Sequence, residues 1–253
     1  MPEAITLWKI YDKIDNKTYE IAATWPRMAI FERSEYFDSD NIFEFPSILS
    51  NGKDFNFTEY FDNKTNVSAK IRQSSLINCL GQQINLLKEG YSVVECGAGP
   101  TQSSLYISRL LSRISYAGDY FVYDTFEGHP SYDTSENYKA KEHIYSHEKF
   151  CQSFGTLPFI RIVKGKVPDS FKIACPTEIC FISLDMNIYE PTLAALETLW
   201  PRLILGGIIH LDDYNIRPCK GVTKAVDEFL SDKDSIFTFK HPTGGCFLIK
   251  REE

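Results

Sequence analysis

Short apolar segments alternate with helical patterns between residues 91 and 230, and this alternation limits the fold more than any other feature of the chain. A short apolar run bounded by turn residues indicates a parallel strand that is buried on both faces. We expect such strands at residues 91–96, 119–123, 159–163, 179–184 and 208–211.

Helical patterns occupy most of the intervals, and a further one runs from about residue 66 to Gly90, ahead of the first strand. The chain closes with two segments, residues 235–240 and 245–250, that are typical of an antiparallel hairpin. Together these elements predict an α/β fold, a Rossmann-like seven-stranded and mostly parallel sheet with a C-terminal antiparallel hairpin. The other expected helices are residues 102–112, 136–153, 191–200 and 222–230.

The first part of the chain differs from the rest in composition. We expect residues 66–253 to form the Rossmann-like domain and residues 1–65, which are rich in aromatic residues, Asn, Asp and Lys, to form an N-terminal arm. The segment Asp15-Asn16-Lys17-Thr18 is predicted to turn a hairpin. A lid, a substrate wall and a dimer contact all remain open as roles for this arm.

Composition excludes several classes of protein. The 253 residues, 43% hydrophobic, suffice for one large domain, and the net charge of −7 argues against a protein that coats nucleic acid. The seven cysteines are scattered without zinc spacing, which predicts reduced thiols in a cytoplasmic protein. The longest apolar stretch, residues 203–211, is too short to span a membrane. We therefore expect neither a nucleic acid nor a membrane as partner, and a homo-oligomer stays open.

Three acids follow two of the expected strands. Asp185 comes directly after residues 179–184, and Asp212 and Asp213 come directly after residues 208–211. Ligands of open α/β sheets bind beyond the carboxyl ends of the strands, where these side chains would converge. Carboxylate oxygens suit Mg²⁺, so we expect a metal site there. Solvated strand-end acids are the alternative.

A glycine turn follows the first strand, in Glu95-Cys96-Gly97-Ala98-Gly99-Pro100-Thr101. Such a turn lets the backbone approach a ligand and leads into helix N–H groups, as an adenosyl cofactor requires. A dinucleotide dehydrogenase would have a third glycine at Gln102. A purely structural turn is the alternative. The expected cofactor-binding residues are Glu95, Gly97, Ala98, Gly99, Thr101 and Ser103.

Asp124 ends the second expected strand, and Thr125 and Phe126 follow it. An acid at this place normally holds ribose hydroxyls, so we assign these three residues to the cofactor as well. Among the histidines, His129 in the next loop is the candidate to face substrate, whereas His210 inside an apolar strand is expected to be a core residue.

Several segments resemble the macrocin O-methyltransferase (TylF-type) family, in the order of the family's motifs. The likeness covers residues 91–230, and its most specific parts are the segments Asp124-Thr125-Phe126-Glu127-Gly128 and Leu184-Asp185 through Leu193. Further matches are Val93-Val94-Glu95-Cys96-Gly97, residues 206–214 and residues 224–230.

The resemblance implies S-adenosylmethionine and a divalent metal, usually Mg²⁺, as cofactors for the methylation of sugar hydroxyls. It also implies that Asp185, Asp212 and Asp213 bind the metal, that Glu95 and Gly97 line the methionine portion, and that Asp124 holds the ribose. The chain departs from the family at Asn187, where an acid is usual. Catechol-type relatives carry a lysine base where this chain has Ile188, so that mechanism does not carry over.

We therefore expect metal-assisted O-methylation of a sugar, either nucleotide-linked or part of a glycosylated natural product. Asp185 is the expected proton acceptor and His129 the alternative. Lys164, Lys166, Arg217 and Lys220 could meet phosphate or be solvated surface cations. The rival hypotheses are a catechol-type methyltransferase, an NAD(P)-dependent oxidoreductase and a catalytically silent nucleotide- or glycan-binding protein.

Overall fold

The computed structural model describes residues 67–99, 102–129, 144–233, 236–240 and 244–251, and the backbone of three strands near the N-terminus. Strands β1 (Ile5–Asp12), β2 (Lys17–Thr24) and β3 (Met28–Ile30) form an antiparallel sheet of their own. Asp12 pairs with Lys17 at the end of the β1–β2 ladder, which confirms a hairpin at this place. Lys17 and Thr18 belong to β2, so these two residues lie in a strand and not in the turn.

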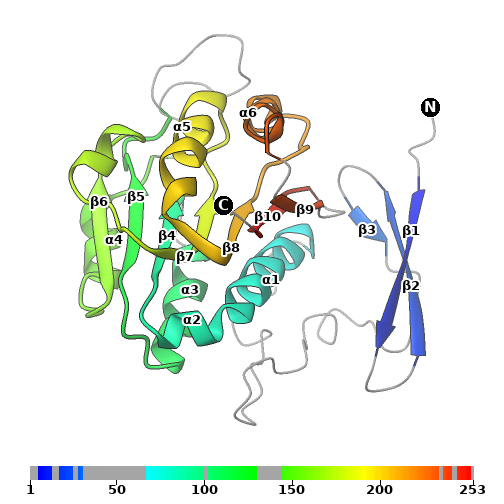
Figure 1. Ribbon diagram of the computed structural model, residues 1–253, viewed down its shortest axis with the longest axis horizontal. Coiled ribbons are helices and arrows are strands. Elements are labelled where there is room, and N and C mark those ends of the chain that lie inside the picture. The colour runs from blue at the N-terminus through cyan, green and yellow to red at the C-terminus, as the bar shows by residue number, and fades with distance from the viewer. Residues whose placement is uncertain are drawn as a thin grey trace.

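The other strands form a seven-stranded sheet in the order β6-β5-β4-β7-β8-β10-β9, as Figure 1 shows. Strand β10 pairs antiparallel with both of its neighbours, whereas the pairs among β6, β5, β4, β7 and β8 are parallel. The predicted fold class is confirmed. The strands are β4 (Ser92–Cys96), β5 (Tyr120–Asp124), β6 (Ile160–Lys164), β7 (Ile179–Leu184), β8 (Leu203–Leu211), β9 (Ile236–Lys240) and β10 (Cys246–Lys250).

Helices cover both faces of this sheet (Figure 1). The described helices are α1 (Val67–Gln82), α2 (Ile84–Lys88), α3 (Gln102–Arg113), α4 (His147–Phe154), α5 (Tyr189–Leu199) and α6 (Lys220–Leu230), with short 3₁₀ turns at Asp169–Lys172 and Trp200–Arg202. None of these helices has the length and apolar character that crossing a bilayer requires. All seven cysteines are free thiols.

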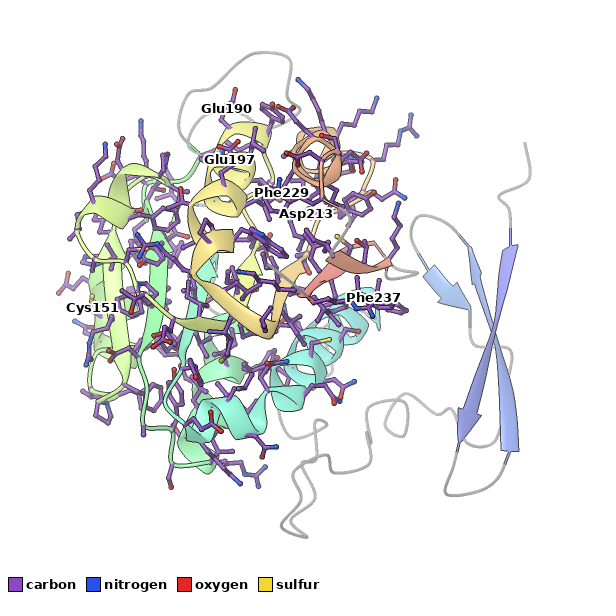
Figure 2. The ribbon with its side chains drawn as sticks, in the orientation of Figure 1. Cys151, Glu190, Glu197, Asp213, Phe229 and Phe237 are labelled. Atoms are coloured by element: carbon purple, nitrogen blue, oxygen red, sulfur yellow. The ribbon has the colours of Figure 1, made fainter. Side chains whose placement is uncertain are left out.

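The alternation of side chains along the strands divides the core in two. Val93 of β4 packs in a cluster with α1, α3 and α4, while its neighbour Val94 packs in a second cluster with α5 and α6. Both valines are fully buried because successive strand residues point to opposite faces, each of which is covered. Helix α5 turns its exposed residues, Glu190 and Glu197, away from the sheet (Figure 2).

Three predicted elements differ from the observed ones. The helix expected from residue 66 to Gly90 is divided into α1 and α2 at Gln83. The helix expected at residues 136–153 begins only at His147 within the described residues, because the Ser146 side chain accepts a hydrogen bond from the Lys149 N–H (3.2 Å) and caps it. Strand β8 begins at residue 203 rather than 208, and its pairing with β7 contains an irregularity.

Candidate active site

A cavity of about 480 Å³ opens at the carboxyl ends of β4, β5, β7 and β8, beside the point where the strand order reverses. Hydrogen bonds just beyond the strands hold these ends together. The Asp185 N–H donates to the Cys96 carbonyl (2.9 Å), and the Asp212 N–H donates to the Leu184 carbonyl (3.1 Å). The first residue after each strand is thereby fixed at the cavity wall, which is why its side chain can serve a site.

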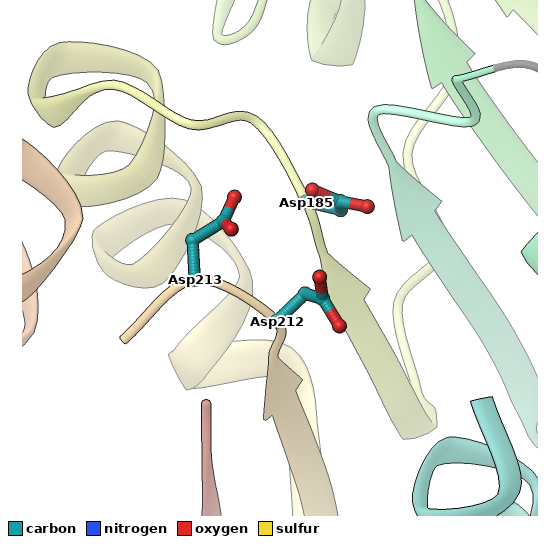
Figure 3. Close-up of side chains that lie close together, drawn as sticks. All are labelled: Asp185, Asp212 and Asp213. Carbon is teal, nitrogen blue, oxygen red and sulfur yellow. The ribbon is translucent and has the colours of Figure 1, made fainter. Parts of the chain in front are cut away.

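The three acids predicted to bind metal lie together in this cavity. Asp185 extends from the end of β7, and Asp212 and Asp213 follow β8 (Figure 3). One carboxylate oxygen of each lies within 4.8 Å of those of the other two. Adjacent strand residues would point to opposite faces, but the chain turns at residue 212, so both acids face the cavity.

The turn that carries Asp212 and Asp213 is held by the C-terminal hairpin. The Gly245 N–H donates to the Tyr214 carbonyl (2.7 Å), and Gly245 has φ +92°. A Cβ atom at Gly245 would lie 2.8 Å from the Leu211 carbonyl oxygen and 3.0 Å from that of Asp212. From the sequence this glycine is only the first residue of the closing hairpin's second segment, and the signal for its role is the Gly-Gly pair directly before the last strand.

The glycine turn after β4 lies against the first acid. Gly97 has φ +84°, and a Cβ atom there would lie 2.0 Å from the Asp185 carbonyl oxygen. Gly99 also has a positive φ, +51°, but a Cβ atom there would meet no atom within 4 Å. Both glycines line the cavity. Gly97 is therefore required by packing, whereas Gly99 leaves space beside the turn that a ligand could occupy.

Asp124 joins the glycine turn to the loop after β5. Its Oδ2 accepts a hydrogen bond from the Ala98 N–H (2.9 Å), and its Oδ1 accepts one from the Phe126 N–H (2.7 Å). The carboxylate lines the cavity and keeps further lone pairs on both oxygens. Asp124 thus holds two loops in place and still presents acceptor oxygens to a ligand.

Glu95 lies beneath the glycine turn and does not line the cavity. It is 1% exposed, and its carboxylate accepts hydrogen bonds from Ser104 Oγ (2.6 Å) and the Tyr120 hydroxyl. Burial raises the pKa of Glu95, and hydrogen bonds from Ser103, Ser104 and Tyr120 oppose that rise. Neither Glu95 nor Ser103 lines the cavity, so both residues support the glycine turn and the start of α3 from beneath.

The remaining predicted cofactor residues are divided between the cavity and the core. Thr125 lines the cavity, and its Oγ1 donates to the Gly128 carbonyl (2.8 Å). Phe126 is 3% exposed and packs on the Phe150 and His147 rings, so its side chain belongs to the core. Thr101 lies outside the described residues.

His129 lines the cavity beside Asn187, with His129 Nε2 3.5 Å from Asn187 Nδ2. Asn187 has φ +65° and its Oδ1 lies 3.9 Å from Cys219 Sγ, so the amide stands between the histidine and the loop that precedes α6. His210 is 4% exposed and packs on Phe247, as expected of a core histidine.

An apolar wall lines the cavity beside the acids, whereas from the sequence a substrate wall is one of three open roles for the N-terminal arm. The loops after β7 and β8 supply it with Met186, Ile188, Pro191, Ile216 and Pro218. These residues lie just after the strand-end acids in the sequence, which is the signal that could have identified them. The cavity therefore combines carboxylates with apolar surface.

The four cations proposed for phosphate binding lie in different places. Lys166 lines the cavity. Lys164 forms an ion pair with Glu127 (2.8 Å). Arg217 and Lys220 line a second hollow, which adjoins the first at Ile216.

The residues present fit both of the expected ligands. Three converging carboxylates are the hard oxygen donors that Mg²⁺ prefers. The space beside Gly99 and the acceptor oxygens of Asp124 fit a ribose-bearing cofactor at the same cavity. The two sets of residues meet where Gly97 contacts Asp185, so a cofactor and a metal would be neighbours.

Comparison with known proteins identifies a family and several relatives that this chain resembles. Residues 69–237 match the model of the macrocin-O-methyltransferase (TylF) family. The 8-demethyl-8-(2,3-dimethoxy-alpha-L-rhamnosyl)-tetracenomycin-C 4'-O-methyltransferase of Streptomyces olivaceus is 29% identical over 142 residues, which are 51% of this chain. That alignment spans 54% of the relative, so this chain covers about half the length of the curated relative that it matches.

Solved structures share the fold at lower sequence identity. The O-methyltransferase NovP superposes with a TM-score of 0.63 at 21% identity, over 75% of this chain and 84% of NovP. CalS11, a TDP-rhamnose 3'-O-methyltransferase of calicheamicin biosynthesis, superposes with a TM-score of 0.56 at 18% identity, over 77% of this chain and 83% of CalS11. The family match extends over more than half of the sequence, and the chain belongs to the macrocin O-methyltransferase (TylF) family.

Proposed function

We propose that the protein transfers a methyl group from S-adenosyl-L-methionine to a sugar hydroxyl, with help from a divalent cation. The observation that carries this proposal is the convergence of Asp185, Asp212 and Asp213 within 4.8 Å, in a cavity that a glycine turn also lines. Membership of the macrocin O-methyltransferase family and the methyltransferase relatives support it.

In this proposal the carboxyl ends of β4 and β5 bind the cofactor. Asp124 accepts hydrogen bonds from the ribose hydroxyls while its two backbone donors keep it in place. Gly97 and Gly99 allow the methionine portion to approach the backbone, and Thr125 contributes to the wall. Glu95 stabilises the turn from below through Ser104 and Tyr120.

The carboxyl ends of β7 and β8 bind the acceptor. Asp185, Asp212 and Asp213 would hold the cation, which when bound would lower the pKa of an acceptor hydroxyl and orient it. Asp185 is the first candidate to accept the hydroxyl proton, and His129 is the alternative on the same wall. Asn187 contacts His129 and has no carboxylate, so it cannot take the proton itself.

A sugar is the acceptor class that fits this half of the cavity. Neighbouring hydroxyls of a sugar ring suit the acids, and the C–H face of the ring suits the apolar wall around Ile188 and Ile216. The Streptomyces relative acts on a rhamnosyl tetracenomycin and CalS11 on TDP-rhamnose, which is consistent with a glycosylated natural product or a nucleotide-linked sugar.

Two further expectations belong to the same proposal. Residues 66–253 carry the activity, and residues 1–65 form a separate arm. The seven free thiols are in keeping with a reducing compartment, so we assign the enzyme to the cytoplasm.

The first test is a calorimetric titration with S-adenosylhomocysteine, the product that the reaction would leave. One-site binding at micromolar concentration supports the proposal, and sugar acceptors can then be assayed for methyl transfer with Mg²⁺ and with EDTA. Absence of binding at millimolar ligand, in a folded sample, would remove the methyltransferase assignment. Full turnover in EDTA would refute the role of the divalent cation.

A further inference from the structure

The second hollow, of about 760 Å³, lies directly beside the cavity and differs from it in charge. Ile216 lines both, and the loop that follows it contributes to them in turn: Arg217 and Lys220 line the hollow, while Pro218 and Cys219 line the cavity. A molecule held in the cavity could therefore extend past Ile216 into the hollow.

Two cations that line the hollow are exposed to a ligand, whereas its two acids accept hydrogen bonds from tyrosine hydroxyls. Arg217 and Lys220 are exposed and make no ion pair with any residue that the structure describes. Asp227 accepts a hydrogen bond from the Tyr214 hydroxyl (2.8 Å), and Glu228 accepts one from the Tyr189 hydroxyl (2.6 Å).

A third cation is held in position at the same place. Lys224 Nζ lies 4.3 Å from the centre of the Tyr189 ring, so its ammonium group stays on the wall of the hollow. Three cations against two acids give the hollow a positive balance, opposite in sign to the three-carboxylate floor of the cavity. Arg and Lys bind phosphate through charge-assisted hydrogen bonds.

We propose that this hollow is a subsite for a phosphate group carried by the acceptor, so that the substrate is a sugar joined to a phosphate or diphosphate. This inference rests on the proposed function and adds to it the class of the acceptor. The sugar ring occupies the cavity at the acids, and its phosphate substituent passes Ile216 to reach Arg217 and Lys220. A nucleoside diphosphate and a simple sugar phosphate share this chemistry.

Calorimetric titrations with uridine diphosphate, inorganic pyrophosphate and uridine test the subsite. They are made in EDTA, so that no cation at Asp185, Asp212 and Asp213 can bind the phosphates. We expect both phosphates to bind the wild-type protein and uridine alone not to bind. Tighter binding of uridine diphosphate than of pyrophosphate would identify a nucleotide as the source of the phosphate, and equal binding would identify a simple phosphate or diphosphate.

The location is tested with the double variant Arg217→Ala/Lys220→Ala, and Lys88→Ala/Lys149→Ala removes the same charge at two exposed positions elsewhere. The first should weaken diphosphate binding by about tenfold or more, since each charge-assisted contact contributes roughly that factor. The control variant Lys88→Ala/Lys149→Ala should bind diphosphate as tightly as wild type. Equal affinity in wild type and Arg217→Ala/Lys220→Ala, or no diphosphate binding to wild type, overturns the subsite.

The same samples are titrated with S-adenosylhomocysteine, which separates this inference from the proposed function. Intact S-adenosylhomocysteine binding without diphosphate binding rejects the subsite alone. With a phosphorylated sugar acceptor, Arg217→Ala/Lys220→Ala should raise KM by about tenfold while kcat stays near wild type, because the cations lie outside the reacting centre.

Discussion

Acidic residues lie at or beneath both halves of the cavity, but they differ in their neighbours. In the half formed by β4 and β5, Glu95 and Asp124 accept hydrogen bonds from the protein: Glu95 from Ser104 and Tyr120, Asp124 from two backbone N–H groups. In the half formed by β7 and β8, three carboxylates converge within 4.8 Å. The first pair organises loops, and the second group concentrates negative charge.

This difference shows that a strand-end acid does not by itself identify its role. Asp124 and Asp185 are equivalent in the sequence, each at the end of an apolar strand. Asp124 is fixed by donors from the glycine turn and from its own loop. Asp185 has two further acids brought beside it by the turn after β8. Neighbours supplied by the fold separate a positioning carboxylate from one of a metal site.

The largest effect should follow from removing an acid of the β7–β8 half. Asp185→Asn or Asp212→Asn should lower kcat by a factor on the order of a hundred or more, because each removes a charged oxygen from the cation site. The affinity for S-adenosylhomocysteine should stay near wild type. Methyl-transfer kinetics and calorimetry measure the two quantities, with Asp169→Asn, an exposed carboxylate paired with Lys172, as control. Wild-type turnover in either site variant would contradict the metal site.

The contact between the two halves should be the next most sensitive point. Gly97→Ala should lower the free energy of unfolding by at least about 2 kcal/mol, because its Cβ atom would lie 2.0 Å from the Asp185 carbonyl oxygen at a positive φ. Gly99→Ala meets no atom and should cost about 1 kcal/mol or less, while weakening S-adenosylhomocysteine binding. Urea denaturation measures the loss in the free energy of unfolding for each of the two variants. Equal losses of stability would show that Gly97 is not held as described.

Asp124→Asn sharpens the comparison within the cofactor half. The amide keeps one acceptor oxygen but turns an NH₂ group toward either the Ala98 or the Phe126 N–H. We expect a loss of about 1–3 kcal/mol in the free energy of unfolding and weaker S-adenosylhomocysteine binding. Asp119→Asn, at the other end of the same strand, removes an exposed ion pair with Arg161 and should cost less than about 1 kcal/mol. A larger loss of stability in Asp119→Asn than in Asp124→Asn would refute this role of Asp124.

The smallest effect concerns the pH dependence of stability. Burial raises the pKa of Glu95 in the folded state above its ordinary value of 4.5, so the folded protein binds more protons than the unfolded chain. Its contribution is fully present below pH 4.5 and is lost as pH rises through the folded pKa. Glu95→Gln should remove this dependence, so the free energy of unfolding of the variant should rise relative to that of wild type as pH rises. Thermal unfolding from pH 4 to pH 8 measures it, with exposed Glu197→Gln as control.

The strands of the sheet were predictable because each is an apolar run that ends at a charged residue or a glycine. All five parallel strands occur where they were expected, with β8 longer than predicted. The helix predicted at residues 136–153 begins at His147 within the described residues, because a single side-chain hydrogen bond at Ser146 determines the start. Helical periodicity carries no information about such a cap.

The sequence by itself determined the sheet, the place of the strand-end acids and the glycine turn, because burial of apolar strands and close approach of the backbone leave direct marks on residue choice. Only the tertiary structure decided that Glu95 lies beneath the cavity and Phe126 in the core, and that the apolar wall comes from the loops around Ile188 and Ile216. It also decided that Gly245 supports Asp212 from a distant hairpin. These relations depend on contacts between segments that are far apart in the chain, and local sequence patterns do not encode such contacts.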